Sequence, residues 1–475
     1  MSFVSLSFLV FLPIVFMTYW LLHRWHKWQN VCLLTASYVF YGWWDWRFLG
    51  LIILTSLSSF SSGLLLDRFS QSQGRTRLVL WCNILLNIGI LSAFKYFDFF
   101  TDSLASLLAH AGISLDMPTL GLILPVGISF YTFQSLSYTI DVYRGQIRPT
   151  TDIFSFCAFV AFFPQLVAGP IERASSLLPQ IQAPRHFSYD EATEGLRRIL
   201  WGFFKKMVVA DNCALAVNQI WNSQADCSSL TLLAGMVLFS FQIYGDFSGY
   251  SDIAVGTARL FGIRLTENFR LPYFSRSMAE FWRRWHISLM SWFRDYLYIP
   301  LGGSRKGTML MVRNTLIVFL LSGLWHGANW TFMVWGLYHA CLLLAERLIG
   351  RRHFSDAPSW RQLPRLLLIF VLVSVGWVIF RADSLPAALH YMQQTVQGIM
   401  SFSFGGLSYG LQALLWCVVL VVVEWMQRRC AHPLVFSTGI SVFRFRVVRW
   451  TVYYLLLLVI IFAHGEEQTF IYFQF

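Results

Sequence analysis

Long apolar segments recur along the whole of this chain and constrain its fold more than any other feature. Runs of about 20 apolar residues match the length that a helix needs to cross the hydrocarbon core of a bilayer. Of the 475 residues, 56% are hydrophobic and 13% are charged, whereas a soluble domain carries about 25% charged residues. The sequence therefore predicts an all-α polytopic membrane protein, with a single integral domain over residues 1–475. Residues 3–22 are expected to be a retained first helix, because no basic segment precedes them and no small-residue cleavage site follows.

The charge pattern and the cysteine pattern argue against a nucleic-acid-binding protein and against a metal site. The net charge of +12 is typical of a membrane protein whose cytoplasmic loops face anionic lipid. No basic-aromatic patch lies outside the loops that flank the apolar runs, so nucleic acid is not an expected partner. The eight cysteines show neither C-x-x-C spacing nor pairing with histidine, so we expect them to be packing residues and expect no metal site.

The distribution of Lys and Arg orients the chain across the membrane. Basic clusters predict that residues 24–27, 68–77, 144–148, 351–365 and 428–449 lie inside. Residues 98–119 and 382–407 contain no Lys or Arg and are expected outside, with spans at 78–97, 120–140, 366–380, 411–426 and 451–463. Both termini are then outside. Residues 154–169 and 280–300 make no clean span, and re-entrant backbone around a central cavity would accommodate them.

Two histidines are the candidates for chemistry. His326 lies in the sequence Leu-Trp-His-Gly, within a run at 314–344 that contains no Asp, Glu, Lys or Arg. An ionisable side chain at membrane depth is costly and therefore marks a functional site. His286 lies 40 residues upstream in Phe-Trp-Arg-Arg-Trp-His. A lone buried histidine is more often a core residue bonded to backbone or water, but two of them, each beside a tryptophan, favour chemistry.

Residues 267–306 form the densest polar segment of the sequence. The cytoplasmic location of this segment would explain any single arginine in it. As a set, its cations could bind the phosphates of an anionic cytoplasmic donor, and a thioester of coenzyme A or phosphopantetheine would fit. The set comprises Arg270, Arg276, Arg283, Arg284, Arg294, Arg305 and Lys306.

A second polar segment, residues 239–252, places Asp246 and Asp252 among small and apolar residues. Asp246 could orient a histidine or accept a hydrogen bond from a tyrosine. A polar network that packs helices together would explain the same residues equally well, and both interpretations stay open.

Together these segments resemble the membrane-bound O-acyltransferase family and, within it, the bacterial alginate O-acetyltransferase branch. The resemblance extends in order through residues 125–131, 141–145 and 162–170, the Asp246 and His286 segments, and residues 324–327. It implies a ring of transmembrane and re-entrant helices around a central tunnel, in a bacterial inner (cytoplasmic) membrane. It also implies that His326 is the catalytic histidine and that His286 is the second histidine of the family motifs. Gly245 departs from the pattern, which usually has an aromatic residue there.

Acyl transfer needs a base that deprotonates an oxygen nucleophile and donors that stabilise the developing oxyanion. His326 is the candidate base. Asn329 could support it, although a spacing of three residues also suits ordinary packing in a helix. His286 would assist or position the donor, with Arg283 and Arg284 as donor-binding residues. The absence of a G-x-S-x-G motif disfavours a serine hydrolase.

The segment 470–475 carries four aromatic residues in six, which is unusual for a free polar end. It would be tucked into the protein or serve as an aromatic anchor at the membrane boundary. The same ending is similar to the terminal motif of the polysaccharide-acetylating branch, and to the tyrosine-bearing tail of a small protein of teichoic-acid D-alanylation. That resemblance implies that Tyr472 is a covalent relay, activated by His326. Relay and anchor both stay open.

The sequence thus predicts an acyltransferase, expected to be an O-acetyltransferase, that moves an acetyl group across the membrane for O-acetylation of an exported or envelope polysaccharide such as alginate. Acetyl-CoA is the expected donor substrate, no cofactor is expected to be bound, and a separate periplasmic or extracellular transferase would complete the reaction. Alternatives are an enzyme of this family acting on peptidoglycan, cellulose or teichoic acid, a transporter or flippase of a lipid-linked sugar, and a non-catalytic assembly subunit. The histidines at 110, 339, 390 and 464 are expected to be structural, with His339 in the same helix as His326.

Overall fold

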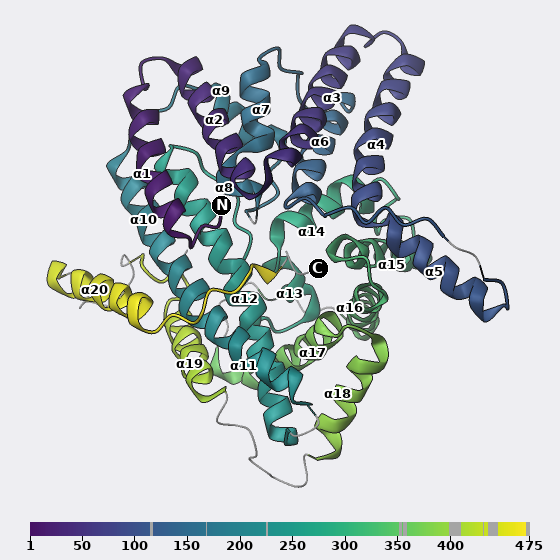
Figure 1. The fold of residues 1–475 in the computed structure, drawn as a ribbon, viewed down its shortest axis with the longest axis vertical. Helices are drawn as coiled ribbons and strands as arrows, with labels where there is room; N and C mark the ends of the chain where they lie inside the picture. Colours follow the sequence, from purple (N-terminus) through teal and green to yellow (C-terminus); the bar gives the residue numbers. More distant parts are fainter. Residues whose placement is uncertain are drawn as a thin grey trace. The chain divides into compact units, whose positions relative to one another are not determined.

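The computed structural model describes residues 1–114, 117–167, 169–224, 227–350, 354, 359–398, 410–430, 432–435 and 445–471. All regular elements among these residues are helices (Figure 1), and six helical segments are long and apolar enough to cross a membrane. The prediction of an all-α polytopic membrane protein is therefore confirmed. The chain forms two compact units, Met1–Gly195 with Thr257–Thr266, and Leu196–Gly256 with Glu267–Phe475. The single integral domain stays a prediction.

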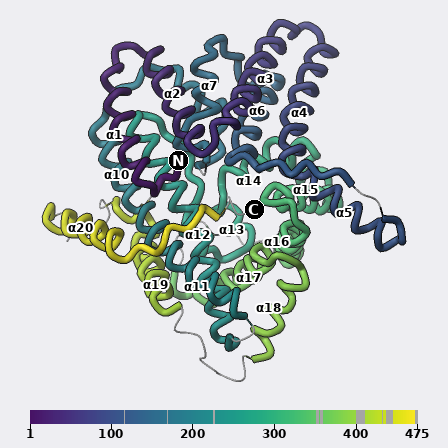
Figure 2. The backbone as a smooth tube through the Cα atoms, viewed as in Figure 1, coloured from purple at the N-terminus to yellow at the C-terminus, as the bar shows by residue number. Residues whose placement is uncertain are grey.

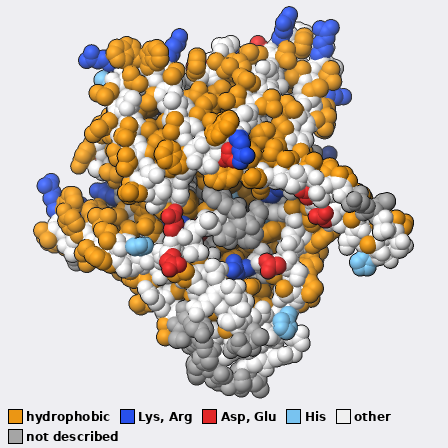
Figure 3. All heavy atoms as spheres, viewed as in Figure 1, with side chains coloured by type: hydrophobic (Ala, Val, Ile, Leu, Met, Phe, Trp, Pro, Cys, Tyr) orange, Lys and Arg blue, Asp and Glu red, His pale blue; other side chains and the backbone are white. Residues whose placement is uncertain are grey.

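The first unit consists of helices with apolar outer faces. Leu, Met and Trp side chains of α1, α2 and α4 are exposed, and Figure 3 shows hydrophobic atoms over the face that these helices present. Such faces suit contact with lipid chains. Its elements are α1 (Leu6–Leu21), α2 (His26–Asp45), η1 (Trp46–Phe48), α3 (Leu49–Arg68), α4 (Gln73–Lys95), α5 (Phe97–His110), α6 (Ile128–Tyr143), α7 (Ile153–Ala161), α8 (Phe163–Leu166), α9 (Ala174–Gln182) and the start of α10 (Tyr189–Phe203).

Helix α3 packs closely on α6 because a glycine lies at their contact. A Cβ atom on Gly63 would lie 2.5 Å from the hydroxyl oxygen of Tyr138. Small residues commonly allow membrane helices to approach each other in this way. The hydroxyl of Tyr138 in turn accepts a hydrogen bond from the backbone N–H of Thr150 at 3.2 Å, which fixes the segment that leads into α7.

The second unit contains the candidate site. Its helical path alternates long helices with short ones. Its elements are the end of α10, η2 (Phe204–Ala210), α11 (Asp211–Asn222), α12 (Ser229–Leu260, up to Gly256), η4 (Pro272–Phe274), α13 (Met278–Arg284), α14 (Ile287–Phe293), η5 (Arg294–Tyr298), α15 (Thr308–His326), α16 (Trp330–Ile349), η6 (Trp360–Gln362), α17 (Leu363–Arg381), α18 (Leu385–Gln397), α19 (Leu411–Met426) and α20 (Arg446–Phe462).

Several predicted segments agree with these bounds and two do not. The predicted spans at 78–97, 366–380, 411–426 and 451–463 correspond to α4, α17, α19 and α20, and residues 154–169 and 280–300 indeed form no single long helix. The expected outer loop at 98–119 is largely the helix α5, since Phe97, Phe100 and Leu104 recur at helical spacing. The span expected at 120–140 starts only at Ile128. Residues 115–116 and all of 399–407 lie outside the described residues.

The hairpin of α15 and α16 is held together by glycines. A Cβ on Gly336 of α16 would lie 2.2 Å from the carbonyl oxygen of Phe319, and a Cβ on Gly323 of α15 would lie 2.2 Å from that of Phe332. The two helix backbones therefore touch, which only residues without a side chain permit. This contact fixes the end of α15, where His326 lies.

Candidate active site

His326 is the last residue of α15 and is 5% exposed. Its imidazole contacts the rings of Trp325, Trp335 and Phe380, with centroids 4.9, 5.0 and 5.3 Å away. Gly327 ends the helix, and a Cβ there would lie 2.2 Å from the ring of Phe332. The Leu-Trp-His-Gly sequence thus places a histidine in an aromatic enclosure at a helix end.

The chain leaves the helix at Gly327, so Asn329 and His339 do not lie in the helix of His326, contrary to the expected placement; the supporting role of Asn329 stays a prediction. Asn329 begins the next helix: its side chain accepts from the backbone N–H of Thr331 at 3.0 Å and donates to the carbonyl of Asp383 at 3.1 Å. It is therefore a cap of α16 and shows no bond to the histidine. His339 lies in α16, not in the helix of His326, and is fully buried between aromatic rings.

His286 is held by Asn268, a residue that the sequence did not single out. The Nδ1 of His286 lies 3.1 Å from the Oδ1 of Asn268, which also accepts from the hydroxyl of Ser288 at 2.9 Å. The amide nitrogen of Asn268 donates to Ser251, which fixes the orientation of the amide. Because an amide oxygen only accepts, Nδ1 of His286 carries the proton and Nε2 carries the lone pair.

The environment of His286 keeps it neutral. It is 1% exposed, and burial lowers its pKa to about 3. Its Nε2 has no hydrogen-bond partner among the described residues. Its backbone is left-handed, with φ of 45°, between α13 and α14. Such strain in a residue other than glycine persists only where the surroundings impose it, and it is concentrated at functional sites.

The two histidines pack against the same indole ring, that of Trp325. The ring centroid of Trp325 is 5.7 Å from that of His286 and 4.9 Å from that of His326. The structure therefore brings together the two residues that the sequence proposed for chemistry, although they are 40 positions apart.

The C-terminal tail, residues 463–471, follows α20 and runs along α12 (Figures 1 and 2). Phe470 packs on the rings of Tyr250 and Phe247, with centroids 4.5 and 5.9 Å away, and Phe247 lies 4.7 Å from the ring of His286. Phe470 and Ile471 are each 1% exposed, so this part of the tail is tucked into the protein. Tyr472 and residues 473–475 lie outside the described residues.

Asp246 belongs to a polar network between helices, in agreement with one of its two expected interpretations, and it also holds the tail, which neither interpretation had foreseen. Its Oδ2 accepts from the backbone N–H of Ile471 at 2.7 Å, and its Oδ1 lies 2.9 Å from Nζ of Lys206. The same ammonium group donates to Asp211 at 2.6 Å and to the carbonyl of Gln468 at 3.0 Å. No bond from Asp246 to a histidine or tyrosine is present among the described residues, so the expected orienting role is not observed.

The close contact between the segment that carries Lys206 and α12 explains how Lys206 reaches Asp246. Lys206 belongs to η2, the π-helical segment that continues α10, and η2 touches α12 where two glycines of α12 face it. A Cβ on Gly249 would lie 3.0 Å from the backbone nitrogen of Lys206, and a Cβ on Gly245 would lie 2.9 Å from the carbonyl oxygen of Lys205. An aromatic residue at position 245, which the resemblance led us to expect, would not fit this contact.

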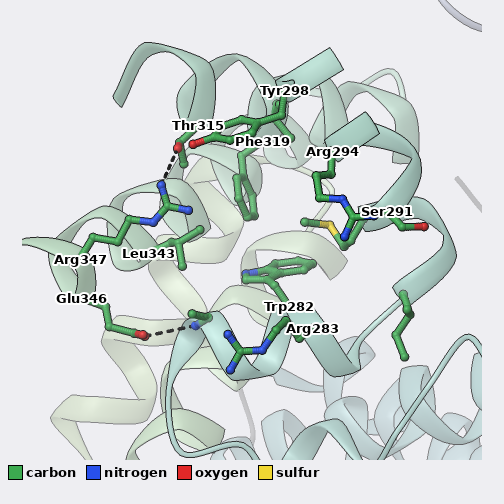
Figure 4. Close-up of a pocket in the computed structure, with 14 residues that line it drawn as sticks. Trp282, Arg283, Ser291, Arg294, Tyr298, Thr315, Phe319, Leu343, Glu346 and Arg347 are labelled. Carbon is green, nitrogen blue, oxygen red and sulfur yellow. Dashed lines mark hydrogen bonds between the residues drawn. The ribbon is translucent and has the colours of Figure 1, made fainter. Parts of the chain in front are cut away.

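Two cavities meet at Arg283. One, of about 440 Å³, has an apolar wall of Trp282, Phe319 and Leu343 and arginines at its edge (Figure 4). The other, of about 620 Å³, is polar, and its cations outnumber its carboxylates. These cations are Arg198, Lys205, Arg270, Arg283, Arg284, Arg428 and Arg429.

The two predicted donor-binding arginines differ in their partners. Arg284 donates to Glu280 at 2.7 Å. Arg283 is exposed, lines both cavities, and forms no hydrogen bond or ion pair with any described residue. Arg283 is therefore available to an anionic ligand, whereas Arg284 is already paired, with a carboxylate that it shares with Arg276.

Comparison with known proteins decides the family. A model of the family described as MBOAT, membrane-bound O-acyltransferase family, matches residues 38–381. The chain belongs to the membrane-bound O-acyltransferase family. This acyltransferase is 39% identical to a protein of Azotobacter vinelandii named probable alginate O-acetylase, over 90% of this chain and 85% of the relative. It is 41% identical to the protein of that name in Pseudomonas aeruginosa, over 83% and 74%, and 31% identical to a peptidoglycan O-acetyltransferase of Helicobacter pylori, over 89% and 88%.

Proposed function

We propose that this acyltransferase takes an acetyl group from a cytoplasmic thioester, acetyl-CoA, and passes it across a bacterial inner membrane for O-acetylation of an exported polysaccharide such as alginate. The relatives named alginate O-acetylase support the acetyl group and the class of acceptor. The observation that carries the proposal is the ring cluster in which His326, His286 and Phe470 of the tail meet.

The two cavities suit the two ends of a coenzyme A thioester. The basic cavity would bind the phosphates, and the apolar cavity beside Trp282 would receive the less polar arm that carries the acyl group. Arg283 lines both and has a free guanidinium group, so it is the residue that we assign to the donor. Arg284, paired with Glu280, would contribute charge at the edge of the site.

In the proposed reaction, His326 removes the proton from the hydroxyl of Tyr472 while the oxygen bonds to the thioester carbonyl carbon. The C–S bond then breaks, and the departing thiolate recovers the proton. A hydroxyl of the acceptor attacks the acetyl ester from the outer side, and the proton returns to the oxygen of Tyr472. Direct transfer from the thioester to the acceptor would instead leave Tyr472 as an aromatic anchor.

His286 is assigned a positioning role in this scheme. Its Nε2 carries a lone pair and no proton, so it accepts a hydrogen bond and cannot donate one to an oxyanion. Its lowered pKa makes it a weak base. A group of this kind orients a hydroxyl or amide of a substrate beside Trp325, while His326 performs the proton transfer.

A separate periplasmic or extracellular transferase would collect the acetyl group, with both termini of this chain outside. The similarity to a peptidoglycan O-acetyltransferase over 89% of the chain makes peptidoglycan the second candidate acceptor.

Covalent labelling tests the proposal. The purified protein is incubated with isotopically labelled acetyl-CoA, and the C-terminal peptide is analysed by mass spectrometry, beside the variants His326→Ala and Tyr472→Phe. His110→Ala is the matched control, because that histidine is exposed at the end of α5 and bonds only to the carbonyl of Ser106.

We expect acetyl on Tyr472 in the unmodified protein and in the control, and none in the other two variants. Full polysaccharide acetylation by Tyr472→Phe would rule out the relay and leave direct transfer. Full activity of His326→Ala would contradict the catalytic assignment, and uptake of a sugar without any labelling of protein or polymer would favour a transporter.

A further inference from the structure

The described tail is held by main-chain contacts as well as by the packing of Phe470. The carbonyl of Ala463 accepts from the side chain of Asn212 at 2.9 Å, and the backbone N–H of Gly465 donates to the carbonyl of Met207 at 3.0 Å. A Cβ on Gly465 would lie 2.7 Å from the backbone nitrogen of Asn212. The start of the tail thus lies directly on the junction between η2 and α11.

One buried cation ties the far part of the tail to this junction. The ammonium group of Lys206 has three oxygens within 3.0 Å, from Asp211, Asp246 and the carbonyl of Gln468. The side chains of Lys206, Asp211 and Asp246 are 1%, 3% and 4% exposed. A charge taken out of water is costly unless it is paired, so without the lysine two buried carboxylates would face each other.

We propose that Lys206, Asp211 and Asp246 form a clamp that seats the C-terminal tail, and that Lys206 is a positioning residue for acyl transfer. This inference rests on the proposed function in one respect, since the residue to be positioned is Tyr472, which follows Ile471 in the chain. The clamp binds the tail through the carbonyl of Gln468 and the N–H of Ile471. Because both are main-chain groups, the clamp works whatever side chain follows at position 472.

The neighbouring lysine provides a matched control. Lys205 belongs to the same π-helical segment, is also buried, and pairs with Asp252 at 2.5 Å and with the hydroxyl of Ser248 at 2.9 Å. Its ion pair and hydrogen bond are with residues of α12, and neither involves the described tail; because Lys205 also lines the polar cavity, its trimming and not its acetyl labelling serves as the control. Lys205→Met therefore removes an equally buried cation from the same helix without touching the proposed clamp.

Trimming of the full-length protein by a carboxypeptidase measures whether the tail is seated. The variants are Lys206→Met, Asp246→Asn and Lys206→Arg, with Lys205→Met as control, all confirmed by size-exclusion chromatography to be folded. Mass spectrometry follows loss of Ile471 and of the residues before it. Trimming of a segment that opens and closes rapidly reports the population of its open form, so we expect loss of Ile471 about tenfold faster or more in Lys206→Met.

Asp246→Asn keeps an oxygen that can accept from Ile471 but loses the charge that faces Lys206, so we expect an intermediate rate of trimming. Lys206→Arg keeps the cation and should restore protection at least in part. Lys205→Met should trim at the rate of the unmodified protein, even if its melting temperature falls. Protection of Ile471 in Lys206→Met, or equal trimming of Lys205→Met and Lys206→Met, would overturn the clamp.

Acetyl labelling of the same samples separates the clamp from the relay. Tyr472→Phe should keep the tail protected and lose the label, whereas Lys206→Met should lose both. If the unmodified protein carries no acetyl on Tyr472 but Lys206→Met still exposes the tail, the relay fails and the clamp stands. If Lys206→Met exposes the tail and yet is acetylated on Tyr472 at the normal rate, the positioning role is refuted.

Discussion

Asn268 fixes the tautomer of His286 by accepting a hydrogen bond from its Nδ1 across 3.1 Å. The hydroxyl of Ser288 donates to the same oxygen, so the amide cannot turn without losing two bonds at once. The lone pair of His286 is thereby directed to its Nε2, which has no partner among the described residues. A neutral histidine whose Nδ1 donates to the protein and whose Nε2 can still accept a hydrogen bond is suited to orient a substrate hydroxyl.

Replacing Asn268 with alanine should release this tautomer. We expect the acyl-transfer rate to fall by about 100-fold, the loss that a misplacement of a reacting group by about 1 Å can cause. Asn268→Asp keeps the acceptor and should retain more activity than the alanine variant. Initial rates of polysaccharide acetylation in membrane vesicles measure both, and an unimpaired Asn268→Ala enzyme would refute the positioning role of His286.

The pH–rate profile of the reaction should contain no inflection from titration of His286. Its pKa lies near 3, below the usual value of 6.5, because burial disfavours the charged form. The imidazole therefore stays neutral above that value and gains a proton only as the pH falls through it. Between about pH 5 and 9, His286→Gln should lower the rate but leave the shape of the pH–rate profile unchanged. A profile that loses an inflection in this variant would show that His286 titrates in the working range.

The sequence was sufficient to predict the fold class and the family, and it singled out two histidines that the structure brings together at Trp325, whose catalytic roles stay a proposal. His326 and His286 were recognisable because an ionisable residue in an apolar, Trp-rich segment has few purely structural explanations. Asn329 and His339 were misplaced because residues 314–344 look continuous on apolar character alone. In the structure Gly327 ends α15, and two helices result.

Asn268 and Lys206 could not be found in the same way, because their roles depend on contacts across long stretches of chain. Asn268 meets His286 from 18 residues away, and Lys206 meets Gln468 from 262 residues away. One signal for Lys206 was present in the sequence, since 204–210 places two lysines in an otherwise apolar segment. Asp246 was chosen correctly as a residue of interest, but its partner proved to be the tail.

The glycine contact between α15 and α16 should be sensitive to a single methyl group. In Gly336→Ala the new Cβ would lie 2.2 Å from the carbonyl oxygen of Phe319, so the hairpin must open. We expect a loss of about 1–3 kcal/mol in stability, as for other overpacked sites, together with lower activity because His326 ends the same hairpin. Gly89→Ala in α4 is the control, since nothing lies within 4 Å of its Cβ position. Thermal unfolding in detergent compares the two, and equal melting temperatures would contradict the packing argument.

Donor affinity should depend on Arg283. Its guanidinium group has no acceptor among the described residues and lines both cavities, so Arg283→Gln should raise KM for acetyl-CoA by about tenfold, equivalent to one charge-assisted hydrogen bond, with a smaller effect on kcat. Arg77→Gln, an exposed arginine of α4 that lines neither cavity, should leave KM unchanged. An unaltered KM in Arg283→Gln would place the donor elsewhere.

Because the clamp binds the tail through its backbone, the side chains of the tail can vary more freely than its length. Side chains between Gly465 and Ile471 make few of the contacts that the clamp requires, because an acceptor at Gln468 and a donor at Ile471 are supplied by the peptide backbone. Deleting one residue from this stretch would shift every peptide group by one position and offer the clamp the wrong carbonyl and the wrong N–H. The number of residues in the tail therefore sets which peptide groups reach the clamp. In related chains the length of the tail should tolerate less change than its composition.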